Sequence, residues 1–384
     1  MTRDTNLLII GAGPFGLAMA AYAQHLNMDY LVVGKFMEFW KSHMPKGLIL
    51  RSACDWHLDP VGIHTAENYL QTKGLTPQEV EPLSLEFYLS YADWFQQQKG
   101  FNILPAYVQR LDCSNSGFEA TLDDGETLRA NNVLLAIGFR YFKNIPPELA
   151  EILPAGSFSH TCDLVDFAGF KEKRCLVIGG RQSAFEWAAL LNEAGATAVH
   201  VSHRHETPEF KPSNWSWVNQ MIDEMVASPG WYRNLPSKEK EEVNQRFWAE
   251  GRLKLEPWLQ SRVKRESVKI WPKSQVAFCH KLSTGEFEVT LDTGDKRDKI
   301  AVDHIALATG YRVNMAQVPF LARGNLLERL ETRNGCPVLD ERFQSSVPGL
   351  FITSMPATQD FGPFLAFTVS VGASAKIIAS ALKG

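Results

Sequence analysis

The sequence predicts an α/β protein composed of two similar units, each a parallel β-sheet whose first strand leads through a glycine turn into a helix. The apolar run Leu7–Ile10 leads straight into Gly11, Gly13 and Gly16. A short, continuous apolar run of this kind is typical of a buried parallel strand. The same pattern returns in CLVIGGRQSA, which spans Cys175–Ala184. A chain of 384 residues is also long enough for two domains.

The three glycines of the first turn have separate expected roles. Gly11 allows the tight turn, Gly13 lets the backbone approach a pyrophosphate, and Gly16 lets the helix pack on the strand. The helix that follows directs its free N–H groups and the positive end of its dipole at the phosphates. Because the pattern follows a strand and opens a helix, we interpret it as a dinucleotide-binding turn of the Rossmann type. A glycine-rich turn without a ligand is the alternative.

Two further segments recur in the same order and at nearly the same spacing. FEATLDDG, which begins at Phe118, returns as FEVTLDTG at Phe287, and the strand that ends at Gly138 (VLLAIG) returns in the strand that ends at Gly310 (IALATG). Each half is therefore expected to end with a β-ribbon and a strand that stops at a glycine, where a cofactor can lie close to the backbone. Two dinucleotide sites in one chain suggest that electrons pass from one nucleotide cofactor to the other.

Composition excludes several classes of function. Hydrophobic residues make up 45% of the chain and charged residues 21%, as in ordinary globular proteins, and the net charge of -4 argues against nucleic acid as a partner. The six cysteines form no CxxC pair, which argues against a redox dithiol, a zinc ribbon and a disulfide scaffold, and no metal site is expected. The chain shows no signal segment, and its longest apolar stretch, Phe361–Leu382, is interrupted by glycine and lysine. We therefore expect a cytoplasmic protein that has no membrane partner.

Several motifs together resemble a known family. GAGPFG at Gly11–Gly16 matches an FAD motif, and Asp303 with the following LATGY matches the D-x-x-x-L-A-T-G-Y motif of N-hydroxylases. LSLEFYLSYADWF resembles the helix before the FAD ribbon, and FSH at Phe158–His160 resembles the shortened linker signature of flavin-containing monooxygenases. The chain thus resembles the class B flavin-dependent monooxygenases, a group of two-dinucleotide-binding flavoproteins that includes flavin-containing monooxygenases, YUCCA-type enzymes and amine N-hydroxylases. The full Baeyer–Villiger fingerprint is not present.

The resemblance implies a reaction and its cofactors. FAD would occupy the first site and NADPH the second, NADPH would reduce the flavin, and O₂ would then add to the flavin as a C4a-hydroperoxide. A small soluble substrate would be hydroxylated at a heteroatom, with N-hydroxylation the main expectation. Carbon hydroxylation of a heterocycle, an NAD(P)H:acceptor flavin oxidoreductase without a dithiol, and a flavin-binding protein with an impaired nicotinamide site are the alternatives. No side chain stands out as catalytic, since the flavin carries the chemistry.

The first site departs from the usual pattern at one position. The second strand is expected at Tyr30–Val33, and an acid that holds the adenosine ribose normally follows it. Here Gly34 and Lys35 follow, so Glu38 or Lys35 would have to make this contact. In the family, the segment that corresponds to residues 39–60 wraps the flavin, and a short strand at Val108 lies against the adenine. Ordinary packing under a loop is the alternative for the aromatic residues of this segment.

The second turn is the most informative anomaly. Arg181 stands where the second glycine of a GxGxxA pattern is expected. Its side chain either pairs with the phosphates or clashes and weakens nicotinamide binding. Gln182 and Ser183 match the family phrase, which favours a working site. After the strand expected at Ala198–Ser202 no acid is present, and Arg204 could pair with a 2′-phosphate, so NADPH is favoured over NADH; a solvated basic turn is the alternative.

The remaining expectations concern an insertion and the C-terminal part. Residues 206–265 form a Trp-rich insertion with two amphipathic helices, which either covers a site or buries its aromatics internally or in a homodimer. A last strand is expected at Leu350–Thr353, followed by a helix with Pro363 in its first turn and with Phe361 and Phe364 bordering the flavin ring. The FAD-binding domain is expected at 1–155 and 301–384, and the NAD(P)H-binding domain at 156–300. The expected cofactor-binding residues are Gly11, Gly13, Pro14, Phe15, Gly16, Lys35, Trp40, Arg51, Ser52, His57, Val108, Ala136, Gly138, Gly179, Arg181, Gln182, Ser183, Arg204, Thr309, Gly310, Tyr311, Phe361 and Gly362.

Overall fold

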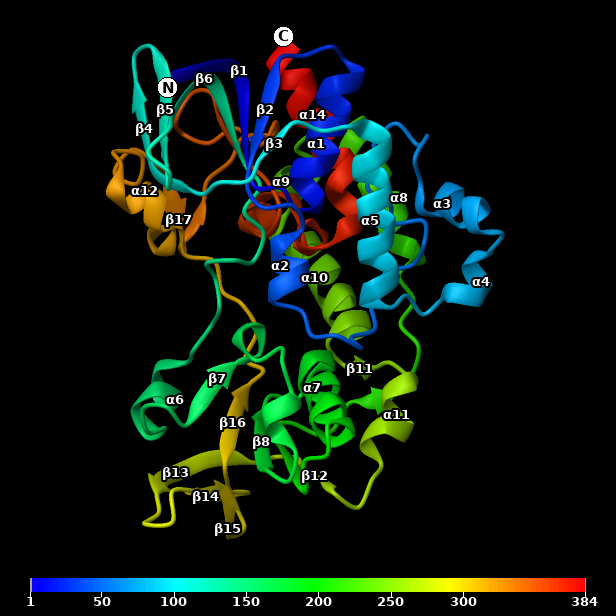
Figure 1. Cartoon of the computed structure of the whole chain (residues 1–384), viewed down its shortest axis with the longest axis vertical. Helices are drawn as coiled ribbons and strands as arrows, with labels where there is room; N and C mark the ends of the chain where they lie inside the picture. The colour runs from blue at the N-terminus through cyan, green and yellow to red at the C-terminus, as the bar shows by residue number, and fades with distance from the viewer. Residues whose placement is uncertain (1, 384) are drawn as a thin grey trace.

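The computed structural model describes residues 2–383 and contains two parallel sheets with the same strand order (Figure 1). In the first sheet, β1 lies between β2 and β6, and β19 extends the sheet beside β6. Ile10 pairs with both Val33 and Leu135, so the three central strands end at the same level. The strands of this sheet are β1 (Thr2–Ile10), β2 (Tyr30–Val33), β3 (Ile103–Leu104), β6 (Thr127–Leu135) and β19 (Leu350–Ile352).

The second sheet repeats this arrangement. Its order β12-β9-β8-β16-β7 matches β3-β2-β1-β6-β19 position by position, and all of its pairs are parallel. The duplication expected from the recurring segments is therefore confirmed. These strands are β7 (Phe158–His160), β8 (Arg174–Ile178), β9 (Ala198–Ser202), β12 (Val268–Trp271) and β16 (His304–Leu307). Because β16 belongs to this sheet, the chain leaves it at Leu307, later than the boundary expected at 300.

Each unit also carries an antiparallel ribbon. In the first unit, Asp123–Gly125 forms the expected tight turn into β6, which continues from the ribbon into the sheet. In the second unit, Asp303 separates the ribbon strand β15 from the sheet strand β16. The ribbon strands are β4 (Val108–Ser114), β5 (Gly117–Leu122), β13 (Gln275–Lys281), β14 (Phe287–Asp292) and β15 (Arg297–Val302).

Helices cover the first sheet and pack into its core. α1 begins with Pro14 at its first position, where a missing N–H costs nothing, and nine of its residues are buried. α1 lies along α14, and α5 buries a stripe of aromatic residues that includes Tyr88, Tyr91 and Phe95 (Figure 1). The helices of this unit are α1 (Pro14–His25), α2 (Glu38–Ser42), α3 (Ala66–Lys73), α4 (Pro77–Val80), α5 (Leu85–Lys99), α12 (Pro319–Arg323), α13 (Thr358–Phe361) and α14 (Val371–Lys383). None of the described helices has the length and apolar character that crossing a bilayer requires.

The insertion connects the two units. Trp217, Ile222 and Phe247 join the hydrophobic core of the first unit, whereas Leu259 and Val263 join that of the second. In Figure 1, α8 and α10 lie among the elements of the first unit and α11 lies beside the second sheet. The two amphipathic helices expected here are thus confirmed as α8 and α10. The elements of this region and the remaining helices of the second unit are α6 (Pro147–Ile152), α7 (Gln182–Glu193), β10 (Glu209–Phe210), α8 (Ser216–Ala227), α9 (Trp231–Asn234), α10 (Ser237–Gly251), β11 (Lys254–Leu255) and α11 (Trp258–Val263). A short hairpin, β17 (Thr332–Arg333) and β18 (Cys336–Pro337), precedes β19.

Candidate functional site

The first glycine turn leaves open space where a phosphate could approach the backbone. Gly11 follows β1 with a φ of 119°, and a Cβ placed on it would lie 2.3 Å from the Ala136 carbonyl oxygen. A Cβ on Gly16 would lie 1.8 Å from the Gly11 oxygen, but no described atom lies within 4 Å of a Cβ built on Gly13. No side chain caps the N-terminus of α1, so its first N–H groups are free for an anion. Pro14 and Phe15 are buried in the first turn of this helix, and the open space beside Gly13 together with the free N–H groups suits a phosphate group.

The end of β2 carries a cluster of charged and aromatic side chains. Arg140 Nη1 lies 2.7 Å from Glu38 Oε2, and the Arg140 guanidinium carbon lies 4.5 Å from the centre of the Tyr107 ring. Lys35 Nζ lies 4.8 Å from the same ring centre. Glu38 is thus already paired with Arg140. Of the two residues expected to replace the missing acid, Lys35 is the one that directly follows Gly34. The buried Val108 begins β4 beside this cluster.

The segment expected to wrap the flavin is hydrogen-bonded to the insertion. Arg51 Nε lies 2.8 Å from Glu256 Oε1, and its Nη1 donates to the Gly251 carbonyl oxygen at 2.6 Å. Ser52, next to it, is half-buried. Trp56 Nε1 donates to Asn219 Oδ1 at 3.3 Å. Arg51 is therefore a link between the first unit and the insertion, which the sequence analysis did not foresee.

Two other residues of this segment, Trp40 and His57, are partly buried. Trp40 packs against Tyr88, with ring centres 4.6 Å apart. His57 Nδ1 is buried and has no hydrogen-bond partner within residues 2–383. Burial lowers the pKa of His57, so the ring is neutral near pH 7. Packing under the loop accounts for Trp40, whereas the orphaned His57 nitrogen is available to a bound group.

Asp59 organises the same loop and should make it sensitive to acid. Its carboxylate accepts hydrogen bonds from the backbone N–H groups of Val61, Ile63 and His64 at 2.8–3.1 Å. Burial alone raises the pKa of Asp59, but these bonds and Lys99 outweigh burial, and the net pKa is lowered. A carboxyl whose pKa is depressed in the folded state stabilises the protein above its unfolded pKa of about 3.9, and this contribution is lost as the pH falls below that value.

We therefore expect Asp59→Asn to lower the free energy of unfolding by about 2 kcal/mol at pH 7, because one carboxylate oxygen is replaced by a donor. Urea denaturation at pH 7 and pH 3.5 measures this, and the difference from wild type should shrink at the lower pH. Asp93→Asn is the control, since the Asp93 side chain is 51% exposed. Equal unfolding midpoints for wild type and Asp59→Asn at pH 7 would disprove this role.

The second glycine turn copies the backbone of the first. Gly179 has a φ of 147°, and a Cβ on it would lie 2.5 Å from the Ala308 oxygen, as Gly11 lies against Ala136. α7 begins without a side-chain cap at its N-cap residue Arg181. Ser183 is exposed, and Gln182 accepts a hydrogen bond from the Glu256 N–H at 3.1 Å. The turn thus has the shape of a dinucleotide turn, with an arginine at its mouth.

The side chain of Arg181 reaches the insertion. Its Nη1 donates to the Arg252 carbonyl oxygen at 2.7 Å, and its guanidinium carbon lies 5.2 Å from the centre of the Trp248 ring. Burial and the charge of Arg252 lower the pKa of Arg181. At the end of β9, Arg204 is exposed and makes no hydrogen bond or ion pair with any described residue. Burial lowers the pKa of the neighbouring His203 to about 4, so this ring carries no charge at neutral pH.

The chain crosses between the units at two glycines. After Gly138 the chain enters the second unit, and after Gly310 it returns, with the Asn144 N–H donating to the Gly310 oxygen at 2.9 Å. Thr309 Oγ1 donates to the Asn144 oxygen at 2.5 Å, and the Tyr311 ring centre lies 4.9 Å from that of Phe139. Figure 1 shows both crossings side by side between the two sheets. Thr309, Gly310 and Tyr311 therefore hold the junction of the two units.

His160, which ends the FSH linker signature, also lies at this junction, together with Cys162, which no sequence motif indicates. His160 Nε2 lies 3.0 Å from the Gly310 oxygen and its Nδ1 lies 3.1 Å from Cys162 Sγ. Burial raises the pKa of Cys162 to about 11, so it stays a neutral thiol. Asp303, at the head of the LATGY motif, accepts bonds from both the N–H and Nε of Arg174, at 2.8 and 3.2 Å. Asp303 therefore fixes the start of β8, and within residues 2–383 its side chain forms no hydrogen bond or ion pair with either glycine turn.

The C-terminal segment differs from the expected helix. The residues after Gly362, whose φ is 96°, form short 3₁₀ turns, and α14 begins only at Val371. Phe361 is 1% exposed and stacks on Phe343, and Phe364 is fully buried. These two rings belong to the core, and it is Phe367 that stays 38% exposed. The expectation of one continuous helix from Pro363 is wrong, because the backbone at Phe367 is extended (φ -126°, ψ 158°) and separates two 3₁₀ turns from each other.

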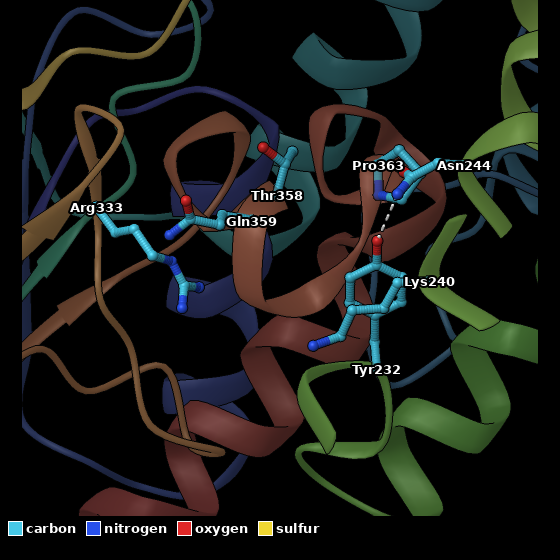
Figure 2. A pocket seen from close by; sticks show the side chains of 7 residues that line it. All are labelled: Tyr232, Lys240, Asn244, Arg333, Thr358, Gln359 and Pro363. Atoms are coloured by element: carbon cyan, nitrogen blue, oxygen red, sulfur yellow. Dashed lines mark hydrogen bonds between the residues drawn. The ribbon is translucent and has the colours of Figure 1, made fainter. Parts of the chain in front are cut away.

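A cavity of about 480 Å³ lies between the insertion and this segment (Figure 2). Lys240 and Arg333 face it from opposite sides, and the Tyr232 hydroxyl accepts a bond from Asn244 Nδ2 at 3.1 Å. Arg333 also donates to the buried Asp360 at 3.0 Å. Its lining residues are Tyr232, Lys240, Asn244, Arg333, Thr358, Gln359 and Pro363. Tyr232 and Asn244 are thus paired with each other, whereas Lys240 and Arg333 are paired with groups outside the lining, Lys240 Nζ with the Arg233 carbonyl oxygen at 2.6 Å.

Comparison with known proteins agrees with this geometry. A thioredoxin reductase of Mycoplasma genitalium is 28% identical over 209 residues, which are 54% of this chain and 57% of that protein. The chain therefore matches little more than half the length of this curated relative. The ornithine N-hydroxylase of Kutzneria sp. 744, solved with reduced FAD, NADP⁺ and L-ornithine, has a TM-score of 0.81 at 14% identity, covering 99% of both chains. The ornithine hydroxylase of Pseudomonas aeruginosa has a TM-score of 0.78 at 16% identity, covering 99% of this chain and 98% of that one.

Because the identities to these two solved structures are below 25%, the structural likenesses establish the fold alone. A family profile covers more of the sequence than the curated relatives do. The profile described as pyridine nucleotide-disulphide oxidoreductase matches residues 8–246, which include both glycine turns and most of the insertion. All six cysteines are free thiols in the structure. The chain belongs to the pyridine nucleotide-disulphide oxidoreductase family.

Proposed function

We propose that this protein is an NADPH-dependent FAD monooxygenase that hydroxylates a small substrate at a heteroatom. The observation that carries the proposal is the pair of uncapped helix N-termini, α1 and α7, each behind a glycine turn that presses on the end of a neighbouring strand. The two ornithine hydroxylases that share the fold over nearly the whole chain support this function. FAD supplies the redox chemistry that the side chains of the protein lack.

In this proposal each unit has its own cofactor. The turn from Gly11 to Gly16 and the N–H groups of α1 bind the FAD pyrophosphate, and Lys35 contacts the adenosine end. The turn that begins at Gly179 binds NADPH, with Arg204 as the partner of the 2′-phosphate. The first sheet is then the FAD-binding domain and the second sheet the NADPH-binding domain. The junction at Gly138 and Gly310 sets the distance across which a hydride passes.

Two further features belong to the same proposal. Location in the cytoplasm is supported by the six free thiols, because reducing compartments keep cysteines unpaired. A homodimer is tested by the mass of the protein in solution, measured by light scattering.

The raised pKa of Cys162 and of the other buried thiols leaves them unreactive, which favours oxygen over a disulfide as the electron acceptor.

The test is coupled turnover in air. FAD-loaded protein is given NADPH and a panel of primary amines, and NADPH consumption, hydrogen peroxide and hydroxylamine product are measured together. We expect one amine class to accelerate NADPH consumption and to give product in place of peroxide. Rapid NADPH oxidation that needs an added quinone, with no oxygenated product, would instead identify an NAD(P)H:acceptor oxidoreductase. No NADPH oxidation under any condition would support a flavin-binding protein with an impaired nicotinamide site.

A further inference from the structure

Two arginines lie close to an exposed indole beside the N-terminus of α7. The guanidinium carbons of Arg181 and Arg252 lie 5.2 and 5.8 Å from the centre of the Trp248 ring, and Trp248 is 49% exposed. Arg181 belongs to the second glycine turn, whereas Trp248 and Arg252 come from the end of α10 and the residue after it. The hydrogen bond from Arg181 Nη1 to the Arg252 carbonyl oxygen joins these two segments. The end of the insertion therefore lies directly against the second turn.

This cluster holds positive charge without a matching acid. Within residues 2–383 the Arg252 guanidinium makes no hydrogen bond or ion pair, and the bond of Arg181 goes to a neutral carbonyl. The acids nearby in the sequence are already paired, Glu256 with Arg51 at 2.8 Å and Glu250 with Lys254 at 2.6 Å. Burial and the charge of Arg252 lower the pKa of Arg181, so the two guanidinium groups repel each other. An anion between them would relieve this repulsion.

The surroundings favour a phosphate group as that anion. α7 has twelve residues, and no side chain caps its first N–H groups, so the positive end of its dipole adds to the two guanidinium charges. Planar guanidinium groups match the oxygens of a phosphate in a bidentate manner. An exposed indole beside them offers a flat face for a nucleotide. The positive φ of Gly179 lets the turn lie close to Ala308 at the end of the neighbouring strand. Arg181 is then the turn residue that stands at the N-terminus of α7.

We propose that Arg252 and Trp248 of the insertion, together with Arg181, form the recognition site for the pyrophosphate of the nicotinamide dinucleotide, whose 2′-phosphate is left to Arg204. This inference rests on the proposed function only in that a nicotinamide dinucleotide binds at the second turn. It means that the insertion, which packs on the first unit, supplies affinity for the cofactor of the second. Arg181, which stands in place of the second glycine, then belongs to a site built from two segments. Its side chain binds the phosphate in place of the backbone contact that a glycine would allow.

The test is binding of NADP⁺, which occupies the site without reducing the flavin. Isothermal titration of FAD-loaded protein should show that Arg252→Ala weakens NADP⁺ by about tenfold or more and that Arg252→Lys recovers part of the loss. The control is Arg246→Ala on the same helix, since Arg246 lies over Trp217, 4.3 Å from its ring centre, and should leave the dissociation constant within about twofold. Trp248→Phe should weaken binding less than Arg252→Ala. In turnover, Arg252→Ala should raise KM for NADPH and leave kcat near the wild-type value.

A second measurement keeps the inference testable if Arg252→Ala folds poorly. Inorganic pyrophosphate should raise the unfolding temperature of the wild type more than that of Arg252→Lys. Unchanged NADP⁺ affinity in both Arg252 variants overturns the inference. Tighter NADP⁺ binding by the variants also overturns it, because the arginine cluster would then obstruct the nucleotide site. A wild type that binds no NADP⁺ overturns it as well. If NADP⁺ affinity depends on Arg252 but no amine gives an oxygenated product, the inference stands and the proposed function fails. If an amine gives an oxygenated product but NADP⁺ affinity does not depend on Arg252, the proposed function stands and the inference fails.

Discussion

Gly16→Ala should yield a colourless protein of reduced stability. The new methyl group would lie 1.8 Å from the Gly11 carbonyl oxygen, a backbone atom that cannot rotate away, so α1 must move off β1. Overpacking at such a site costs about 3 kcal/mol or more. The same displacement moves the N–H groups of α1 away from the phosphates that they are proposed to bind. The visible flavin absorbance of the purified protein and its unfolding temperature should therefore fall together.

Gly13→Ala is the matched variant, because it separates cofactor binding from folding. No described atom lies within 4 Å of a Cβ at this position, and the backbone there has a φ of -91°, which alanine adopts freely. The apoprotein should unfold at the wild-type temperature, whereas FAD affinity should drop by about tenfold, or about 1.4 kcal/mol, because the methyl group occupies the approach to the pyrophosphate. Full FAD affinity in Gly13→Ala would show that the dinucleotide does not lie over this turn.

Arg262→Ala should destabilise the second unit strongly. The Glu186 side chain is 1% exposed and lies 2.9 Å from Arg262 Nη1, with Trp258 Nε1 donating to it at 3.1 Å. Removing Arg262 leaves a buried carboxylate without its cation, which costs about 3–5 kcal/mol. Urea denaturation followed by tryptophan fluorescence measures the loss. Glu193→Gln is the control, since Glu193 is 45% exposed and is the outer partner of the same arginine; it should cost less than about 1 kcal/mol.

The loss caused by Arg262→Ala should depend on pH. Burial raises the pKa of Glu186, against the opposing effects of Trp258, Arg262 and Gln182, and removing Arg262 raises it further. A carboxyl whose pKa is higher in the folded state than in the unfolded state destabilises the fold increasingly as the pH rises from the unfolded pKa of about 4.3 through the folded value. Arg262→Ala should therefore be closer to wild type at pH 5 than at pH 8. An equal loss at both values would mean that packing, and not charge, dominates this pair.

Local signals in the sequence were sufficient for the architecture. A short local pattern predicts the strand and glycine turn at Leu7–Gly16. Another predicts the recurrence that pairs Gly138 with Gly310. β2 and β9 have the bounds that their apolar runs predicted. Such elements follow from local backbone and burial requirements, which periodicity and glycine positions report directly.

Contacts between distant segments could not be read in this way. Nothing in the sequence around Arg51 indicates that Glu256 is its partner, and Arg252 gave no signal at all, because both depend on how the insertion packs across the two units. Pro363 suits the first turn of a helix and so predicts one from this residue, but the extended backbone at Phe367 ends the turn that Pro363 begins. The environment of Arg181 was the hardest to predict, since its side chain is positioned by a helix about seventy residues further along the chain.

The most direct test of the central claim is the anaerobic addition of NADPH to the FAD-loaded protein while the visible flavin absorbance is followed. If the two glycine turns hold FAD and NADPH so that a hydride crosses the junction, one equivalent of NADPH should bleach the flavin, and Gly16→Ala should show no signal because it lacks FAD. A yellow protein whose absorbance neither NADPH nor NADH changes would contradict the account, as would a folded protein that cannot be loaded with FAD.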